Sequence, residues 1–199
     1  MPEGLSHPPR ARDALRAATE AAHLRLHAIP VFRALAEGRL ARADYAALLR
    51  RKLGFHLALE ARLAEAPSLA AFGLEPAARR RVHLLRADLA WLGAPAEAPL
   101  APVPRFVTAE AALGGLYVAE GSTLGGRQLA RAIDAILPPG ADGRRFLLGH
   151  GAQHGAMWRA CCEAIEAAGG GAAPRTTMIE GALATFAAFE AWFAPSGSA

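Results

Sequence analysis

The amino-acid sequence predicts an all-α protein with a single domain. β-Branched residues are sparse while alanine and leucine dominate, a composition that favours helices over strands. In successive segments, apolar residues recur with the period of an α-helix. Clusters of glycine and proline separate these segments, so we expect about six or seven helices. A chain of 199 residues can bury about 70% of its unfolded surface, which allows a substantial shared core.

Each predicted helix has an apolar stripe that would face this core. The stripes are Leu15, Ala18, Ala22 and Leu26 in the first helix, Tyr45, Leu48, Leu49, Leu59 and Leu63 in the second, and Val82, Leu85, Leu89 and Leu92 in the third. The expected breaks lie near residues 30 and 66 and at 94–105, 137–140 and 169–174.

Two helix starts have local signals. Pro76 suits the first turn of the third helix, and Thr177 with Glu180 has capping-box spacing for the last one. We expect a flexible N-terminus over 1–10, one helical domain over 11–195 and a flexible C-terminus over 196–199.

Charge and composition exclude several classes of protein. The net charge of +4 comes almost entirely from arginine, since Lys52 is the sole lysine, and it favours an anionic partner. Nucleic acid fits poorly because the arginines are scattered and not gathered in a stripe with aromatic residues. No apolar run approaches the length of about 20 residues that a membrane span needs. The first ten residues do not resemble a secretory signal, so we expect a cytoplasmic protein.

The two cysteines are Cys161 and Cys162, which are adjacent in a helical pattern. A disulfide between such neighbours would be strained, so both are expected to be small core residues.

The stretch "LYVAEGSTLGGRQLAR" at 116–131 places three glycines, Gly121, Gly125 and Gly126, inside an otherwise helical pattern. Three interior glycines cost a helix about 3 kcal/mol relative to alanine, so another interaction must offset them. A phosphate loop is disfavoured because neither the Lys-Ser/Thr ending nor a preceding strand is present. Two interpretations remain: a close helix–helix crossing, or a planar ligand lying against bare backbone.

The first helix offers a candidate metal ligand. At about 100° per residue, His23 lies about 80° from Leu15 and His27 about 120° from it, so His23 should be the more buried. A hydrogen-bonded core histidine is one interpretation. The other is a porphyrin site, because the axial nitrogen of His23, the cation of Arg16 and the apolar stripe occur on one helix.

The segments 15–35 and 114–131, together with "LGFHLALEARL" at 53–63 and "LLRADLAWLG" at 84–93, resemble the bacterial biliverdin-forming haem oxygenases. These enzymes are often paired with bacteriophytochromes. The likeness covers the chain from about residue 11 to 194, and the "LYV-EGSTLGGR" block is its most specific part.

The resemblance implies an all-helical fold with haem between a proximal helix that carries the axial histidine and a kinked, glycine-rich distal helix. His23 matches the proximal ligand, and Gly121, Gly125 and Gly126 match the distal glycines. Haem would be both substrate and prosthetic group, opened by O2 to biliverdin, carbon monoxide and ferrous iron. Electrons would come from an external donor, a ferredoxin or a reductase, and a bacteriophytochrome would accept the bilin.

The remaining site candidates follow from the same resemblance. Arg16, Tyr117 and Arg175 would hold the haem propionates, although core packing for Tyr117 and a solvated surface position for Arg175 are alternatives. Thr19 belongs to the Thr-x3-His element that ends at His23.

Two positions depart from the family pattern. Ser122 stands where animal members have an aspartate that organises distal water, so proton delivery would use Ser122 or Thr123 with water. His27 stands where relatives commonly have aspartate and is an alternative axial ligand. Two rival functions also remain: a haem-binding or haem-transfer protein of this fold, and a helical module whose glycines serve only dimer packing.

Overall fold

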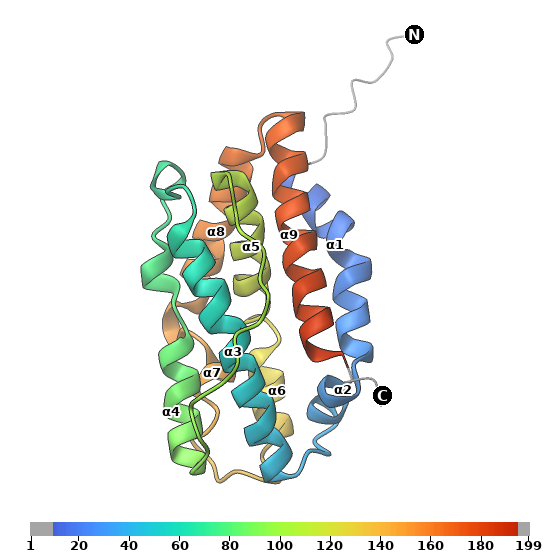
Figure 1. Ribbon diagram of the computed structural model, residues 1–199, viewed down its shortest axis with the longest axis vertical. Helices are drawn as coiled ribbons and strands as arrows, with labels where there is room; N and C mark the ends of the chain where they lie inside the picture. Colours follow the sequence, from blue (N-terminus) through green and yellow to red (C-terminus); the bar gives the residue numbers. More distant parts are fainter. Residues whose placement is uncertain (1–9, 195–199) are drawn as a thin grey trace.

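A computed structural model of the protein describes residues 10–194, and this part of the chain contains helices and no strand (Figure 1). The all-α prediction is therefore confirmed. The predicted flexible ends fall largely on residues 1–9 and 195–199, which lie outside the described residues.

The α-helices are α1 (Ala11–Ala28), α2 (Pro30–Ala36), α3 (Arg42–Glu65), α4 (Val82–Leu92), α5 (Ala109–Gly121), α6 (Gly126–Ala132), α7 (Arg145–Leu148), α8 (His154–Ala168) and α9 (Ala172–Phe193). Three short 3-10 helices lie at Ala70–Phe72, Pro76–Arg79 and Gly151–Gln153. The helix count exceeds the expected six or seven within residues 10–194, because α2, α6 and α7 are short helices of 7, 7 and 4 residues.

The predicted breaks near residues 30 and 66 and at 94–105 and 137–140 are all present, but the two predicted helix starts are wrong. Pro76 begins a separate 3-10 helix whose first turn is capped by the Glu75 side chain, and α4 begins only at Val82. Thr177 lies inside α9, where its hydroxyl donates to the Ala173 carbonyl. The last helix can begin earlier, at Ala172, because Pro174 falls in its first turn, where no backbone N–H is needed.

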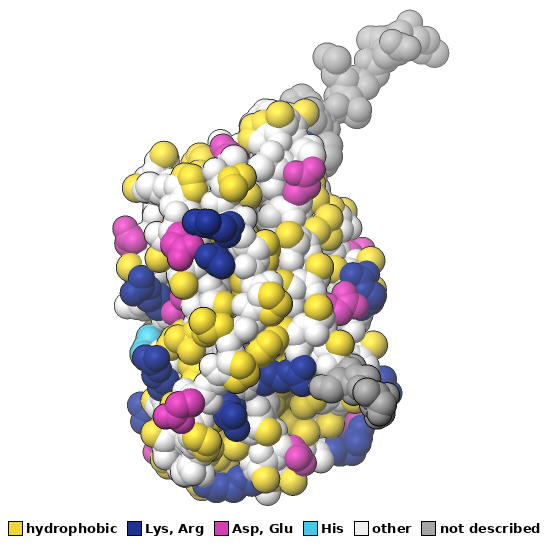
Figure 2. Space-filling model, viewed as in Figure 1, with side chains coloured by type: hydrophobic (Ala, Val, Ile, Leu, Met, Phe, Trp, Pro, Cys, Tyr) yellow, Lys and Arg dark blue, Asp and Glu magenta, His cyan; other side chains and the backbone are white. Residues whose placement is uncertain are grey.

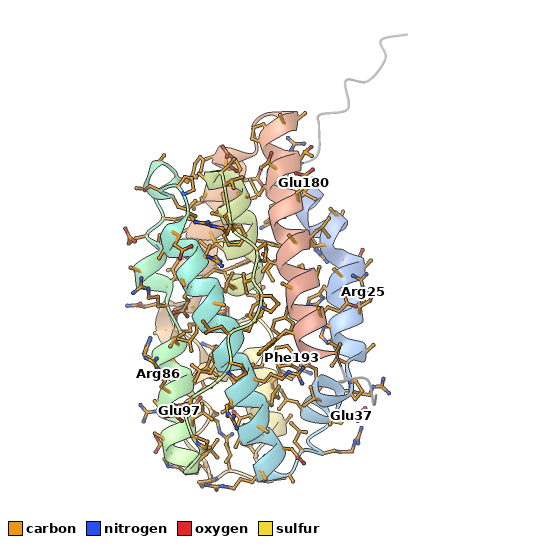
Figure 3. The ribbon with its side chains drawn as sticks, in the orientation of Figure 1. Arg25, Glu37, Arg86, Glu97, Glu180 and Phe193 are labelled. Carbon is orange, nitrogen blue, oxygen red and sulfur yellow. The ribbon has the colours of Figure 1, made fainter. Side chains whose placement is uncertain are left out.

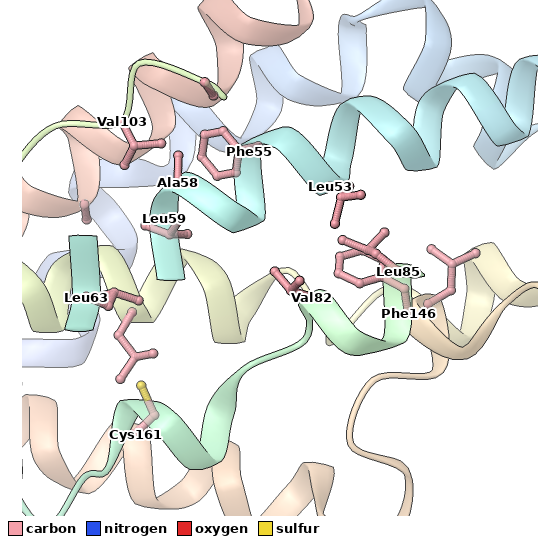
Figure 4. Packing of buried hydrophobic residues seen from close by; sticks show 14 of the residues in the cluster. Leu53, Phe55, Ala58, Leu59, Leu63, Val82, Leu85, Val103, Phe146 and Cys161 are labelled. Atoms are coloured by element: carbon pink, nitrogen blue, oxygen red, sulfur yellow. The ribbon is translucent and has the colours of Figure 1, made fainter. Parts of the chain in front are cut away.

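The helices pack side by side around a leucine-rich core (Figure 1). In that view α9 lies between α1 and α5, while α3 and α4 lie on the other side of α5. Figure 4 shows Leu53 of α3 beside Leu85 of α4 and Phe146 of α7 in this core, while Phe55 points to the other side of α3, toward Val103. No helix of the described chain has the length and apolar character needed to cross a bilayer.

Cys161 lies in the core, as expected, and Cys162 is half-buried. Burial raises the pKa of the Cys161 thiol to about 12, so this residue is an unreactive packing group. On the molecular surface, basic side chains are spread among acidic ones on the face that Figure 2 shows. This arrangement agrees with the scattered arginines of the sequence.

The most extensive helix pair is α5 with α9, and glycines make their close approach possible. A side chain at Gly114 would overlap the Met178 carbonyl oxygen, and one at Gly181 would overlap the Ala111 carbonyl oxygen. Gly115 gives the same kind of room to the Phe106 ring. The close crossing of α5 with α9 therefore uses Gly114, which lies upstream of the glycines that the sequence pattern singles out, together with Gly181 of α9.

We predict that Gly114→Ala lowers the free energy of unfolding by about 2 kcal/mol or more, because the added methyl group must push two helix backbones apart. Urea denaturation followed by circular dichroism measures this change. Gly155→Ala in α8 is the matched control, because its added methyl group meets nothing within 4 Å and should leave stability equal or slightly higher. Equal stability of the two variants would contradict the packing role of Gly114.

Candidate functional site

The helix pattern at 116–131 is broken between α5 and α6. Three backbone amides donate to the residue three positions before them: Thr123 N to Glu120 O at 3.0 Å, Leu124 N to Gly121 O at 3.1 Å, and Gly126 N to Thr123 O at 3.1 Å. The segment is thus tightened into 3-10-like turns. None of its three glycines has a positive φ. Their use here lies in the missing side chain and not in a left-handed backbone.

The three glycines have different surroundings. A Cβ at Gly121 would come no closer than 3.8 Å to the Trp158 ring, and one at Gly125 would meet nothing within 4 Å. A Cβ at Gly126 would overlap the Leu147 carbonyl oxygen, so this glycine serves the contact of α6 with α7. The close-crossing interpretation holds for Gly126 but is wrong for Gly121 and Gly125. These two leave bare backbone on an accessible face.

Hydrogen bonds and a buried ion pair fix the residues next to the glycines. Glu120 forms a buried ion pair with Arg79 at 3.1 Å. The Thr123 hydroxyl donates to the Glu120 carbonyl at 2.6 Å and lies 3.0 Å from His154 Nδ1. The Ser122 hydroxyl donates to the Ala119 carbonyl at 2.7 Å. The residues flanking the glycines are therefore fixed, although the glycines themselves carry no side chains.

Helix α1 exposes the imidazoles of both His23 and His27, whose ring centroids lie 4.7 Å apart. Both residues are exposed, so the edge-of-core position predicted for His23 gives its side chain only partial burial. Phe186 of α9 nevertheless lies 6.4 Å from the His23 ring. Partial burial lowers the pKa of His23, and the nearby His27 lowers it further by a smaller amount. Its imidazole is thus neutral at neutral pH and has a free electron pair to offer a metal.

Two contacts hold α1 in place. At its first turn, the Ala11 and Arg12 amides donate to the Glu166 carboxylate of α8 at 3.0 and 3.1 Å. Near its other end, Arg25 pairs with Glu190 of α9 at 2.8 Å, and Figure 3 labels Arg25 on the outer helix. The carboxylate at the helix N-terminus also satisfies amides that have no partner within the helix. The position of His23 is therefore set by α8 and α9 together.

Three of the predicted ligand-binding residues come together between α1 and α5. Thr19 is buried, and its hydroxyl donates to the Leu15 carbonyl at 2.8 Å. Burial raises the pKa of Tyr117, while its hydrogen bond with Thr19 and the positive charge of Arg16 oppose that rise. Tyr117 of α5 thus interacts with Thr19 and Arg16 of α1, and the three residues form one polar group.

Arg175 lies elsewhere, at the turn from α8 to α9. Its guanidinium donates to the Gly169 carbonyl at 3.2 Å from Nε and 3.0 Å from Nη2. Gly169 packs directly on Ala11, the first residue of α1. Arg175 is half-buried, so its guanidinium is only partly solvated.

Sequence reasoning missed Trp158, which lies near the break, and Lys52, which lies among aromatic rings of other helices. Trp158 of α8 lies beside Gly121 and 5.8 Å from the Tyr117 ring. Lys52 of α3 lies over four phenylalanine rings, and burial lowers the pKa of its ammonium group to about 7. Those rings come from α2, α7 and α9, at positions 32, 146, 189 and 193, and no local pattern connects them.

Comparison with known proteins gives a consistent result. The family model described as "Heme oxygenase" matches residues 10–195. A "Heme oxygenase" of Xanthomonas campestris is 36% identical over 161 residues, which cover 80% of this chain and 94% of that protein.

Two solved structures share the fold. The NO- and CO-bound haem oxygenase of Neisseria meningitidis superposes with a TM-score of 0.70 and 25% identity, over 96% of each chain. Haem oxygenase-1 of the cyanobacterium Synechocystis, solved in complex with haem, has a TM-score of 0.72 and 15% identity, over 93% of this chain and 91% of that one. The chain belongs to the haem oxygenase family and is a haem oxygenase.

Proposed function

We propose that this haem oxygenase opens haem to biliverdin, carbon monoxide and ferrous iron, using O2 and electrons from an external donor, with His23 as the proximal iron ligand. The observation that carries the proposal is the pairing of an accessible neutral imidazole on α1 with bare backbone at Gly121 and Gly125. The relatives from Neisseria and Synechocystis, described as NO- and CO-bound and as a complex with haem, support haem as the ligand of this fold.

The chemistry of the residues present suits an iron porphyrin as the ligand. One neutral imidazole is an axial ligand that haem accepts, and the absence of side chains at Gly121 and Gly125 suits a flat macrocycle. When bound, haem supplies the iron that activates dioxygen and the ring carbon that is oxidised. His27 is the alternative ligand, because its ring lies beside that of His23.

Arg16 and Tyr117 are our first candidates to hold the propionates, with Thr19 orienting the Tyr117 hydroxyl. Arg16 supplies positive charge, and the Tyr117 hydroxyl supplies a hydrogen bond. Arg175 is a third candidate, from the turn beside the first residue of α1. Holding the propionates would fix which edge of the porphyrin faces the glycines and hence which carbon is oxidised.

The proposed distal residues contribute through the absence of side chains. Gly121 and Gly125 bring no acid–base side chain to the face of the ligand, so ring oxidation is favoured over cleavage of the O–O bond. The hydroxyls of Ser122 and Thr123 already donate to backbone carbonyls, so each can accept a further hydrogen bond from water. We propose that protons arrive through water held at Ser122 or Thr123. Gly126 contributes by letting α6 approach α7.

The electron donor is proposed to be a ferredoxin or a reductase with an acidic face, which suits the arginine-rich surface. A bacteriophytochrome is the proposed acceptor of the bilin. Both partners follow from the family resemblance.

Turnover of haemin by the purified protein tests the function. With oxygen and an electron donor, the Soret band should decay while biliverdin absorbance appears. A stable Soret band without biliverdin would favour the haem-binding or haem-transfer alternative. No haem spectrum at all would favour a module whose glycines serve only packing between subunits.

We predict that His23→Ala abolishes the histidine-ligated ferric spectrum and leaves the helical circular dichroism unchanged, because His23 is accessible and not part of the core. His27→Ala is the matched control and should keep that spectrum. If His27→Ala loses the spectrum and His23→Ala keeps it, the ligand assignment moves to His27.

We predict that Gly125→Leu weakens haem binding by about tenfold or more while the protein stays folded, because the new side chain occupies space that the ligand needs. Haem titration by absorbance measures the affinity. Gly155→Leu on α8 is the control, since a side chain there also meets nothing within 4 Å. Wild-type affinity and turnover in Gly125→Leu would contradict the bare-backbone role.

A further inference from the structure

The break between α5 and α6 leaves the Ala119 carbonyl without its helical partner. In a continuous helix, the Ala119 carbonyl would accept from the Thr123 amide. Here the Thr123 amide donates to Glu120 O at 3.0 Å. An unpaired carbonyl at this point would be costly, because Ala119 lies in the wall of a small cavity shared with His56, Leu59 and Glu60.

Arg81 replaces the missing donor. Its Nη2 atom lies 2.7 Å from the Ala119 carbonyl oxygen and 3.1 Å from the Ser122 hydroxyl. The Ser122 hydroxyl also donates to the same carbonyl at 2.7 Å. One guanidinium nitrogen therefore binds both residues where the backbone leaves α-helical geometry. Its positive charge is also favourable at the carboxyl end of α5, the negative end of the helix dipole.

Arg81 is held rigidly enough to act as a fixed support. It is 3% exposed, and its own amide donates to Glu60 Oε1 of α3 at 2.7 Å. The guanidinium lies 4.9 Å from the Phe146 ring of α7. Burial lowers the pKa of Arg81 to about 10, while Glu120 and Glu60 oppose that change, so the side chain remains a cation at neutral pH.

We propose that Arg81 is a positioning residue that fixes the bare-backbone segment of α5–α6 by supplying the hydrogen bond the helix loses at Ala119. Arg81 acts through Ala119 and Ser122 on the segment that carries Gly121 and Gly125. The effect on haem rests on the proposed function, whereas the effect on the backbone does not.

Hydrogen exchange in the haem-free protein tests the backbone effect. In Arg81→Met, the amides of Thr123, Leu124 and Gly126 should exchange about tenfold faster than in the unchanged protein, because a charge-assisted hydrogen bond is lost. Amides within α9 should keep their rates. Arg86→Met is the matched control: Arg86 is an exposed arginine of α4, labelled in Figure 3, and its loss should change none of these rates.

Azide binding to the ferric haem-loaded protein gives a second readout. Azide should bind about tenfold more weakly in Arg81→Met, because both the placement of the glycine segment and a nearby positive charge are lost. Arg81→Lys keeps the charge and one donor, so it should recover part of both effects; it is also the variant to use if Arg81→Met fails to fold. The position and intensity of the Soret band report whether haem is bound.

The outcomes separate this inference from the proposed function. If the protein binds no haem, the exchange measurement still tests Arg81. Unchanged exchange at Thr123, Leu124 and Gly126 in Arg81→Met would overturn the inference even in an active enzyme. A uniform increase across α3, α5 and α9 would also overturn it, because it would show only a loss of global stability.

Discussion

The α5–α6 segment has to pack tightly against its neighbours and at the same time keep part of its backbone bare. Glycine meets both demands, at different positions. Gly114 and Gly126 remove side chains where the backbones of α9 and α7 approach, whereas Gly121 and Gly125 remove them where no neighbouring backbone approaches. Gly114 and Gly126 allow the segment to pack closely on its neighbours, and Gly121 and Gly125 leave its open surface. The rest of the proposed site depends on this division.

A bare backbone can serve as a site only if it does not move. The hydrogen bonds that would stabilise a continuous helix are partly lost at the break, and buried charged side chains stabilise the segment in another way. Arg79 pairs with Glu120, and Arg81 donates to Ala119 and Ser122. Both arginines come from the segment that enters α4, so residues next to α4 hold the glycine segment in place. On the opposite side, Glu166 and Glu190 hold α1, which carries His23.

The sequence predicted the fold class and most of the breaks, because apolar periodicity and proline positions are local signals. It also singled out the glycines and His23 as site candidates, since both stand out against the helix pattern. It could not separate Gly126 from Gly125, because the difference depends on the Leu147 carbonyl of another helix. Nor could it identify Arg81, which belongs to a run of three arginines that resembles a solvated charge cluster and yet is 3% exposed. The short helices α2, α6 and α7 were missed because each is stabilised by packing and not by length.

A crystal structure of the protein grown with haemin tests the central claim most directly. The account predicts iron bound by the imidazole of His23, with the other face of the porphyrin lying against the backbone of Gly121 and Gly125. Iron bound by another side chain, or a porphyrin whose second face lies away from those two glycines, would contradict it.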